Sequence, residues 1–189
     1  MKNRRFLLSV DLAQGIEAGA VGKKDSDYNI INIFEIEPLS PHQIEKNRNN
    51  SAINVKDTVQ YKQVGIYMDN LNDESACAEA AKFITFQIFK SGFKGIDNVR
   101  ILVEMNFNGN NWLNKFKTCP SYYGAVIIKT PNGEKQDPNK PVKMMYGYKT
   151  KGGAKGKNYW CERGANLMLK RQLIIRQYDE NNINISSIG

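Results

Sequence analysis

Apolar runs alternate with polar segments along this chain, and their lengths predict an α/β order of strands and helices. Five runs have the length and the β-branched and aromatic content of strands: 5–11, 28–37, 60–68, 99–104 and 123–128. Helices are predicted over three further segments: 73–91, 109–117 and about 156–170. A short final strand begins at Leu173. The pattern therefore predicts one sheet flanked by helices.

Two segments carry more detailed expectations. Asn72, Asp73 and Glu74 would cap the helix over 73–91. The packed side of that helix is expected to consist of apolar residues at helical spacing: Ala76, Ala80, Phe83, Ile84 and Phe86 or Ile88. Residues 39–58 are polar, with Pro41 and many asparagines, and are predicted to form a surface excursion.

Two acidic residues each follow an apolar run directly. Asp11 follows the run 6–10, and Glu104 follows the run 99–103. A carboxylate in such a position is costly to bury without a partner. Two of them in separate strands suggest a shared cation. The simpler alternative is that both are ordinary strand-end acids that face water, as most Asp and Glu residues do.

The order of the predicted elements indicates a fold that brings these acids together. Three strands in a meander, followed by helix, strand, helix and strand, is the order of the ribonuclease H-like fold. In this α/β mixed sheet the later strands would join the antiparallel meander in parallel through right-handed crossovers. Asp11 and Glu104 would then lie side by side at the carboxyl edge of the sheet, where a divalent cation would relieve their repulsion.

Composition limits the class of protein. The 189 residues, 41% of them hydrophobic and 10% aromatic, are expected to form a single globular domain over residues 1–189. No apolar run reaches the roughly 18 residues that a membrane span needs. Three widely spaced cysteines and one histidine argue against a zinc site or a disulfide framework, and they favour a reducing compartment. Any metal would therefore be held by oxygen.

The positive charge is concentrated in one stretch of the chain. Residues 143–176 contain nine Lys and Arg against Glu162 alone, and aromatic residues such as Tyr148 and Trp160 lie among them. Such a basic block is typical of a surface that binds a phosphate backbone. The alternative is a solvated basic helix face. Lys149, Lys151, Lys155 and Lys157, in a Gly-rich segment, are the candidate contacts to DNA phosphates.

Several motifs together resemble a known family. Residues 9–15 (SVDLAQG), 25–28 (DSDY) and 103–106 (VEMN, followed by Gly109) resemble the nuclease domain of tailed-phage large terminase subunits. The family motifs read roughly V-D-x-x-x-G, x-D-Y and E-x-N-x-x-G. Residues 146–150 (YGYKT) are similar to the family's segment before its last strand. The order and spacing of the motifs are more specific than any one of them, and the resemblance covers nearly the whole chain.

The resemblance implies two-metal hydrolysis of DNA by Mg²⁺ or Mn²⁺. Asp11 would bridge both ions, Glu104 would hold one, and Asp27 would be a further ligand or would support one. Asn106 could bond a ligand or a carboxylate, although asparagine after a strand is also a common turn former. The implied partners are double-stranded DNA and, in a full-length protein, the terminase small subunit and the portal protein. The implied location is the cytoplasm of an infected bacterial cell.

One departure from the family concerns the third acid, usually an Asp in a helix beyond the last strand. Nothing in this chain matches that motif, because Asp179 and Glu180 come too soon after the strand that begins at Leu173. The expectation is a nuclease domain that lacks its C-terminal end. The family's ATPase has no counterpart either, since no G-x-x-x-x-G-K-[ST] occurs.

Three alternatives remain open at this point. A non-catalytic DNA-binding or packaging-assembly module would use the basic block alone. A resolvase-type nuclease would use the same acids. Residues 8–15 also look like the first phosphate loop of the actin and sugar-kinase group, but those proteins need two duplicated domains and a second phosphate loop, which this length does not hold.

Overall fold

A six-stranded mixed sheet forms the centre of the protein. The computed structural model describes residues 4–12, 28–49, 59–70, 74–92, 98–106, 108–117, 125–131, 141–149, 164–165, 167–168 and 172–175. The strands of the main sheet are β1 (Arg5–Asp11), β2 (Asn29–Pro38), β3 (Val59–Asp69), β4 (Val99–Val103), β5 (Ala125–Ile127) and β8 (Leu173–Ile174). Their order is β5-β4-β1-β2-β3-β8.

The strand directions are those expected from the sequence. The strands β1, β2 and β3 form an antiparallel meander, whereas β4 joins β1, β5 joins β4 and β8 joins β3 in parallel. This α/β mixed sheet is compatible with the ribonuclease H-like fold. The predicted neighbours, the first strand and the strand after the long helix, are indeed paired.

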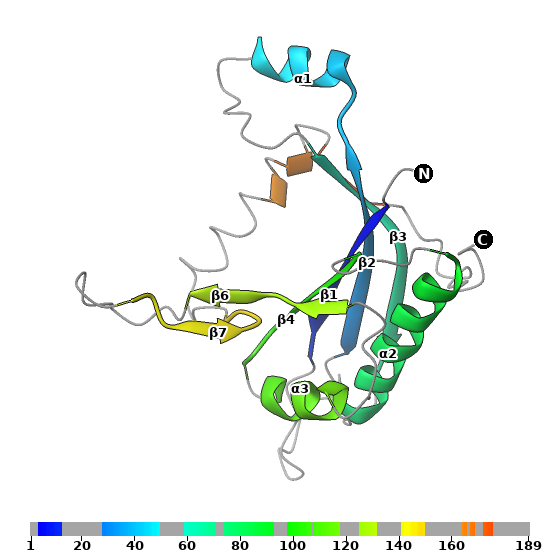
Figure 1. Ribbon diagram of the computed structural model, residues 1–189, viewed down its shortest axis with the longest axis vertical. Coiled ribbons are helices and arrows are strands. Elements are labelled where there is room, and N and C mark those ends of the chain that lie inside the picture. Colours follow the sequence, from blue (N-terminus) through cyan, green and yellow to red (C-terminus); the bar gives the residue numbers. More distant parts are fainter. Residues whose placement is uncertain are drawn as a thin grey trace, which may run out of the picture.

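Three helices and a small second sheet complete the described structure (Figure 1). The helices are α1 (Pro41–Arg48), α2 (Glu74–Lys90) and α3 (Gly109–Lys117). The second sheet pairs β6 (Lys129–Pro131) with β7 (Met144–Tyr146) in antiparallel fashion and extends away from the main sheet. None of the helices in the described parts of the chain is long and apolar enough to cross a membrane.

The hydrophobic core lies between one face of the sheet and the helices α2 and α3. Side chains alternate along a strand, and alternate residues of β1, β2 and β4 are buried in this core together with the inner faces of both helices. Trp112 and Phe116 of α3 stack with their ring centroids 5.1 Å apart inside it. On each of these strands, the residues that alternate with the buried ones lie on the opposite face of the sheet and are more exposed.

The packed side of α2 differs from the expected one. Ile84 and Ile88 are buried as expected, but Phe83 is 55% exposed and Phe86 is also exposed. The buried positions are instead small residues and two isoleucines at spacings of three and four: Cys77, Ala78, Ala81, Ile84, Thr85 and Ile88. Small side chains allow the helix to lie close to the sheet, and the bulky aromatic rings remain outside.

Part of the expected surface excursion is a helix. Pro41 begins α1, which a fixed proline φ favours, and Ser40 accepts a hydrogen bond from the Gln43 backbone N–H at 3.2 Å. Ile44 is the only large apolar residue of this helix, so no apolar periodicity revealed it in the sequence. Further along the chain, the strand expected over 123–128 is β5 in its described part, and it is followed by a strand that was not expected, β6, which begins at Lys129.

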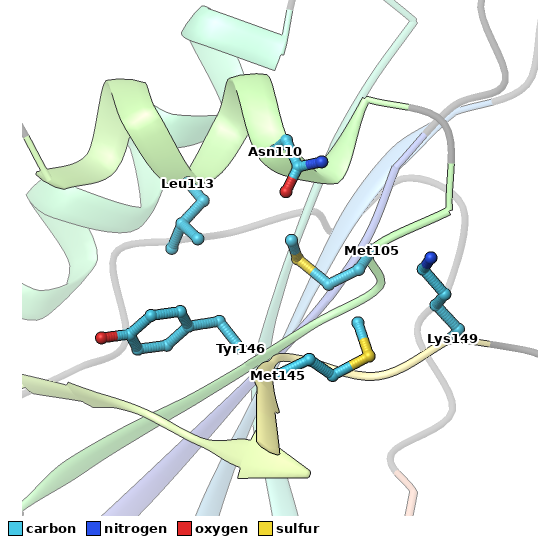
Figure 2. A pocket seen from close by; sticks show the side chains of 6 residues that line it. All are labelled: Met105, Asn110, Leu113, Met145, Tyr146 and Lys149. Carbon is cyan, nitrogen blue, oxygen red and sulfur yellow. The ribbon is translucent and has the colours of Figure 1, made fainter. Parts of the chain in front are cut away.

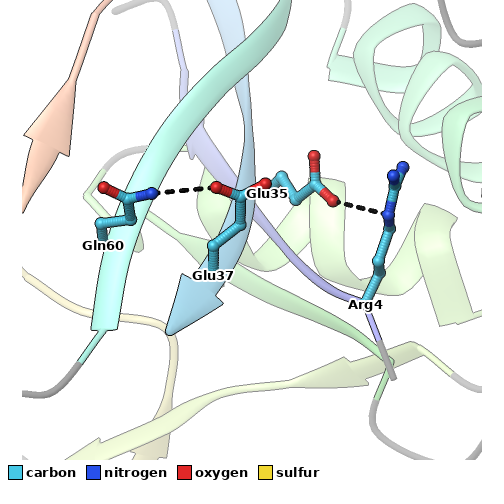
Figure 3. Close-up of polar contacts among 4 residues, drawn as sticks. All are labelled: Arg4, Glu35, Glu37 and Gln60. Carbon is cyan, nitrogen blue, oxygen red and sulfur yellow. Dashed lines mark hydrogen bonds and ion pairs between the residues drawn. The ribbon is translucent and has the colours of Figure 1, made fainter. Parts of the chain in front are cut away.

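The end of β2 farthest from the acid pair is tied to both its neighbours by polar side chains (Figure 3). Arg4 Nε lies 3.1 Å from Glu35 Oε1, and the Glu35 side chain is nearly buried. On the other side, Gln60 donates to Glu37 Oε2 at 2.9 Å. The Arg4 guanidinium supplies the partner that a buried carboxylate needs.

The C-terminal part is described only in places. Residues 164–165 and 167–168 are helical, in agreement with the expected basic helix, and the remainder of 156–170 lies outside the described residues. The final strand is β8, which pairs with the free edge of β3 and is held there by a hydrogen bond from Tyr61 N to Gln172 O at 2.6 Å.

Candidate functional site

Asp11 and Glu104 are brought to neighbouring strand ends. In the parallel pair of β1 and β4, Val10 lies opposite Val103, so the next residues are Asp11 and Glu104. The backbone N–H of Glu104 donates to Val10 O at 2.9 Å, which continues the pairing past the end of β4. Adjacent strands lie about 4.8 Å apart. The backbone therefore holds the two acids side by side.

Both acids belong to the face of the sheet that α2 and α3 leave uncovered. Val10 and Val103 are buried in the core, and side chains of successive strand residues point to opposite faces. Asp11 and Glu104 consequently share the opposite face, where Asp11 is exposed and Glu104 is half-buried. This arrangement makes a shared ligand for the two carboxylates geometrically possible.

The turn after β4 fixes the Glu104 carboxylate. Asn106 donates from Nδ2 to Glu104 Oε1 at 2.8 Å, so the asparagine bonds a carboxylate as the sequence suggested. Gly109 begins α3 so close to this turn that a Cβ there would lie 2.6 Å from the Glu104 carbonyl oxygen. Only glycine allows this approach, which explains the glycine in the E-x-N-x-x-G motif.

A separate segment of the chain lies along the other side of Glu104. Tyr148 forms a parallel bridge with Glu104, with hydrogen bonds from Tyr148 N to Val103 O at 2.9 Å and from Met105 N to Tyr148 O at 2.7 Å. The residue before it, Gly147, has a φ of 66°, and a Cβ there would collide with the Val103 carbonyl oxygen. Asp11, Glu104 and Tyr148 therefore form a row across the sheet edge.

The two carboxylates act electrostatically on the Tyr148 hydroxyl. Burial raises the pKa of Tyr148 above its ordinary value, and the negative charges of Glu104 and Asp11 raise it further. Both acids therefore lie within electrostatic reach of one phenol. Tyr148 stays protonated and presents a neutral O–H donor beside two acceptors.

Another acid at this edge belongs to the opposite face. Asp69 ends β3 and accepts a hydrogen bond from Asn29 Nδ2 at 2.9 Å, and it also bonds Tyr67. These residues lie on the side of α2, where burial and the nearby Asp69 charge raise the pKa of the Cys77 thiol to about 12. Asp69 therefore serves the packing of α2 and lies across the sheet from Asp11.

Lys149, the one described member of the candidate DNA-binding lysines, lies at a hollow between α3 and the segment 145–149 (Figure 2). The hollow has a volume of about 300 Å³. Tyr146 also lines the hollow, and its ring makes cation–π contacts with two lysines. Lys117 Nζ lies 4.1 Å and Lys129 Nζ 4.7 Å from the ring centroid. Positive charge thus gathers around Tyr146, from both α3 and the second sheet.

The other predicted site residues lie outside the described residues: Asp27, Lys151, Lys155 and Lys157. Tyr28, which follows Asp27 in the chain, precedes β2 at the same sheet edge as Asp11, since Ile30 pairs with Asp11. Within the described ranges, no three His, Cys, Asp or Glu side chains are grouped closely enough to hold a metal ion. The described site supplies two acids.

Tyr148 is the site residue that the sequence did not single out for the acid pair. The sequence included it only as an aromatic residue of the basic block, which indicated DNA binding in general, and as part of residues 146–150, which resemble a segment of the terminase family. The chain matches no protein-family model, and no curated protein is significantly similar to it. The functional argument therefore depends on the residues and their geometry.

Proposed function

We propose that this protein is a Mg²⁺- or Mn²⁺-dependent endonuclease that cleaves double-stranded DNA during phage genome packaging. The observation that carries the proposal is the parallel pairing of β1 with β4, which sets Asp11 beside Glu104 on one face. The resemblance of the surrounding motifs to tailed-phage terminase nucleases supplies the substrate and the packaging context. It also implies the terminase small subunit and the portal protein as partners.

The donor set suits a hard divalent cation. Asp11 and Glu104 offer carboxylate oxygens, which Mg²⁺ and Mn²⁺ prefer. These two residues would hold the metal, and Asp27 is the proposed further ligand. When bound, the ions supply an activated water and stabilise the leaving 3′-oxygen during phosphodiester hydrolysis.

The neighbouring residues orient the acids and the substrate in this proposal. The hydrogen bond from Asn106 restricts rotation of the Glu104 carboxylate, so its second oxygen faces a defined direction. Tyr148, as a neutral donor on the same face, can bond either a carboxylate or an entering phosphate without adding negative charge. Lys149, the next residue, adds a cation for the DNA backbone.

The experiment is a nicking assay on supercoiled plasmid with Mg²⁺ or Mn²⁺. Asp11→Asn and Glu104→Gln should each lower the rate by about a hundredfold or more, and the double variant should be no slower, because residues that act as one unit are strongly non-additive. Asp69→Asn is the matched control, since it removes a carboxylate from the same edge but the opposite face. Nicking by Asp11→Asn at the unchanged rate would contradict the proposal.

A non-catalytic DNA-binding or packaging-assembly module is the second candidate. The observation that favours it is the absence of a three-acid group among the described residues. This candidate predicts a gel shift of DNA that neither Asp11→Asn nor metal changes, and no nicking at any metal concentration. Running the gel shift beside the nicking assay separates the two functions.

A further inference from the structure

The hollow beside Lys149 combines an apolar lining with polar groups at its edge. Met105, Leu113 and Met145 supply the apolar part, and Asn110 and Lys149 are exposed beside it (Figure 2). Apolar and polar surface contribute in similar measure to the lining, and binding sites for small organic groups likewise combine apolar contact with a few polar side chains that fix orientation. Its volume of about 300 Å³ suits a small planar group rather than a folded partner.

Two residues that line the hollow directly follow residues of the acid site in the sequence. Met105 follows Glu104 and Lys149 follows Tyr148, and the bond from Met105 N to Tyr148 O holds the two segments together. Since side chains alternate along extended backbone, the acids and the hollow lie on opposite sides of the same strand end. A DNA strand with a phosphate at the acids would have to pass around this strand end for one of its nucleotides to enter the hollow.

The charge around the hollow complements a nucleotide. Tyr146, which lines it, is contacted by the ammonium groups of Lys117 from α3 and Lys129 from β6. Lys149 adds a third cation from a third part of the chain. Ammonium groups pair with phosphate, whereas the apolar lining offers contact to the face of a base. A base in an intact duplex is stacked on both faces, so only an unpaired base could enter.

We propose that the hollow binds one unpaired nucleotide of the DNA substrate, with its base against Met105 and Met145 and its phosphate toward Lys149. The inference rests on the proposed function and narrows its substrate to DNA with an unpaired nucleotide at the site, such as a bulge or a single strand. Methionine side chains are flexible and polarizable, so they adapt to different ring shapes. The hollow therefore accepts any of the four bases.

The test compares Asn110→Asp with Asn111→Asp. Both positions are exposed in the first turn of α3, and both changes add one negative charge, but only Asn110 lines the hollow. Binding is measured by fluorescence anisotropy in EDTA, with a labelled duplex that carries one bulged nucleotide. Asn110→Asp should weaken binding about tenfold relative to Asn111→Asp, the size expected for contact with one base.

A second probe isolates the base. With an abasic site in place of the bulged nucleotide, the unchanged protein should bind less tightly, because the contact with the base is lost while the phosphate remains. Lys149→Ala should weaken binding to both probes, because it removes a phosphate contact. Equal effects of Asn110→Asp and Asn111→Asp on the bulged duplex, or equal affinity of the unchanged protein for both probes, would overturn the inference. Because EDTA prevents cleavage, a failure of nuclease activity does not affect this result.

Discussion

Tyr148 is held beside Glu104 by its backbone. Hydrogen bonds to Val103 and Met105 fix the position of its Cα, and the parallel bridge directs its side chain to the same face as Glu104. Partial burial and the two carboxylates then keep its hydroxyl protonated by raising its pKa. The site at the sheet edge is therefore two acids and one neutral donor.

Removal of this hydroxyl should impair cleavage without harming the fold. Tyr148→Phe keeps the ring and the backbone pairing, so the midpoint of thermal unfolding should change little. The rate of plasmid nicking at saturating Mg²⁺ should fall by about tenfold or more, as expected when a positioned donor is lost. Tyr67→Phe is the control, because that hydroxyl bonds Asp69 on the other face. Equal nicking rates for Tyr148→Phe and the unchanged protein would show that the Tyr148 hydroxyl has no role in cleavage.

Sequence could predict the acid pair because strand alternation is a local pattern and because the order of the elements indicated which strands are neighbours. The apolar runs before Asp11 and Glu104 set both the strand ends and the face, and the order of elements set the neighbours. Tyr148 could not be predicted in this way. Its place depends on a single glycine with positive φ and on contacts to a strand more than forty positions earlier in the chain, and no periodic pattern records either.

Among the elements, the segment 144–149 connects the second sheet to the main one. Its first half pairs with β6, and its second half pairs with the end of β4. Gly147 lies at the change between these partners, where Gly147 N donates to Ile128 O at 2.8 Å and Thr130 Oγ1 donates to Gly147 O at 2.5 Å. The segment is thus anchored on both sides of this glycine.

Gly147→Ala should displace this segment from β4. A Cβ there would meet the Val103 carbonyl oxygen and Met105, and the positive φ adds backbone strain, so the free energy of unfolding should fall by about 2–4 kcal/mol. Gly92→Ala is the matched control. Its φ is also positive, at 91°, but nothing lies within 4 Å of an added Cβ, so the loss should be about 1 kcal/mol.

Urea denaturation measures both changes, and the nicking assay adds a second readout. Under conditions where the Gly147→Ala variant is still folded, it should cleave DNA more slowly than the unchanged protein, because Tyr148 no longer lies beside Glu104. Gly92→Ala should not change the cleavage rate. Equal stability losses for the two variants would mean that the close contact at Gly147 is easily relieved.

Most elements were predictable from the sequence, but the helix α1 and the strands β6 and β7 were not. The bounds of β1 and α3 agree with those expected, because their apolar periodicity is clear. The helix α1 has no apolar face, and its only signal was Ser40 before Pro41. The strands β6 and β7 have three residues each, too few for a period of two to be recognised. The predicted orientation of α2 was partly wrong, because the helix packs through its small residues and leaves the large Phe83 ring exposed.

At the scale of the whole molecule, the positive charge is concentrated in one block of the sequence. The chain carries a net charge of +8, and the block 143–176 alone accounts for an excess of that size. Lys149 belongs to this block and follows Tyr148, which is bridged to Glu104 at the edge that carries both acids. In the proposed function, electrostatic attraction by the block would bring DNA toward the acids.

Binding to DNA should depend steeply on salt. The logarithm of affinity should fall with the logarithm of salt concentration by about 0.9 per phosphate neutralised. Charge reversal at Lys151, Lys155 and Lys157 should weaken binding to all sequences equally and reduce that slope, because phosphates carry no sequence information. Gel shifts across a salt series measure both quantities.

Three basic residues on the helices α1 and α2 provide the control for this change: Lys46, Arg48 and Lys90. Reversing their charges alters the net charge by the same amount but leaves the block 143–176 intact. Equal losses of affinity in the two triple variants would mean that net charge alone attracts DNA, and the block would then be a solvated surface.

If Asp11 and Glu104 form one metal site, the protein should bind Mn²⁺ through both carboxylates. Electron paramagnetic resonance of free Mn²⁺ gives the bound fraction without any need for cleavage. The unchanged protein and Asp69→Asn should bind Mn²⁺ alike, and Asp11→Asn and Glu104→Gln should each lose most of that binding, since each removes a ligand charge. Binding that is unaffected by Asp11→Asn and by Glu104→Gln would contradict the account.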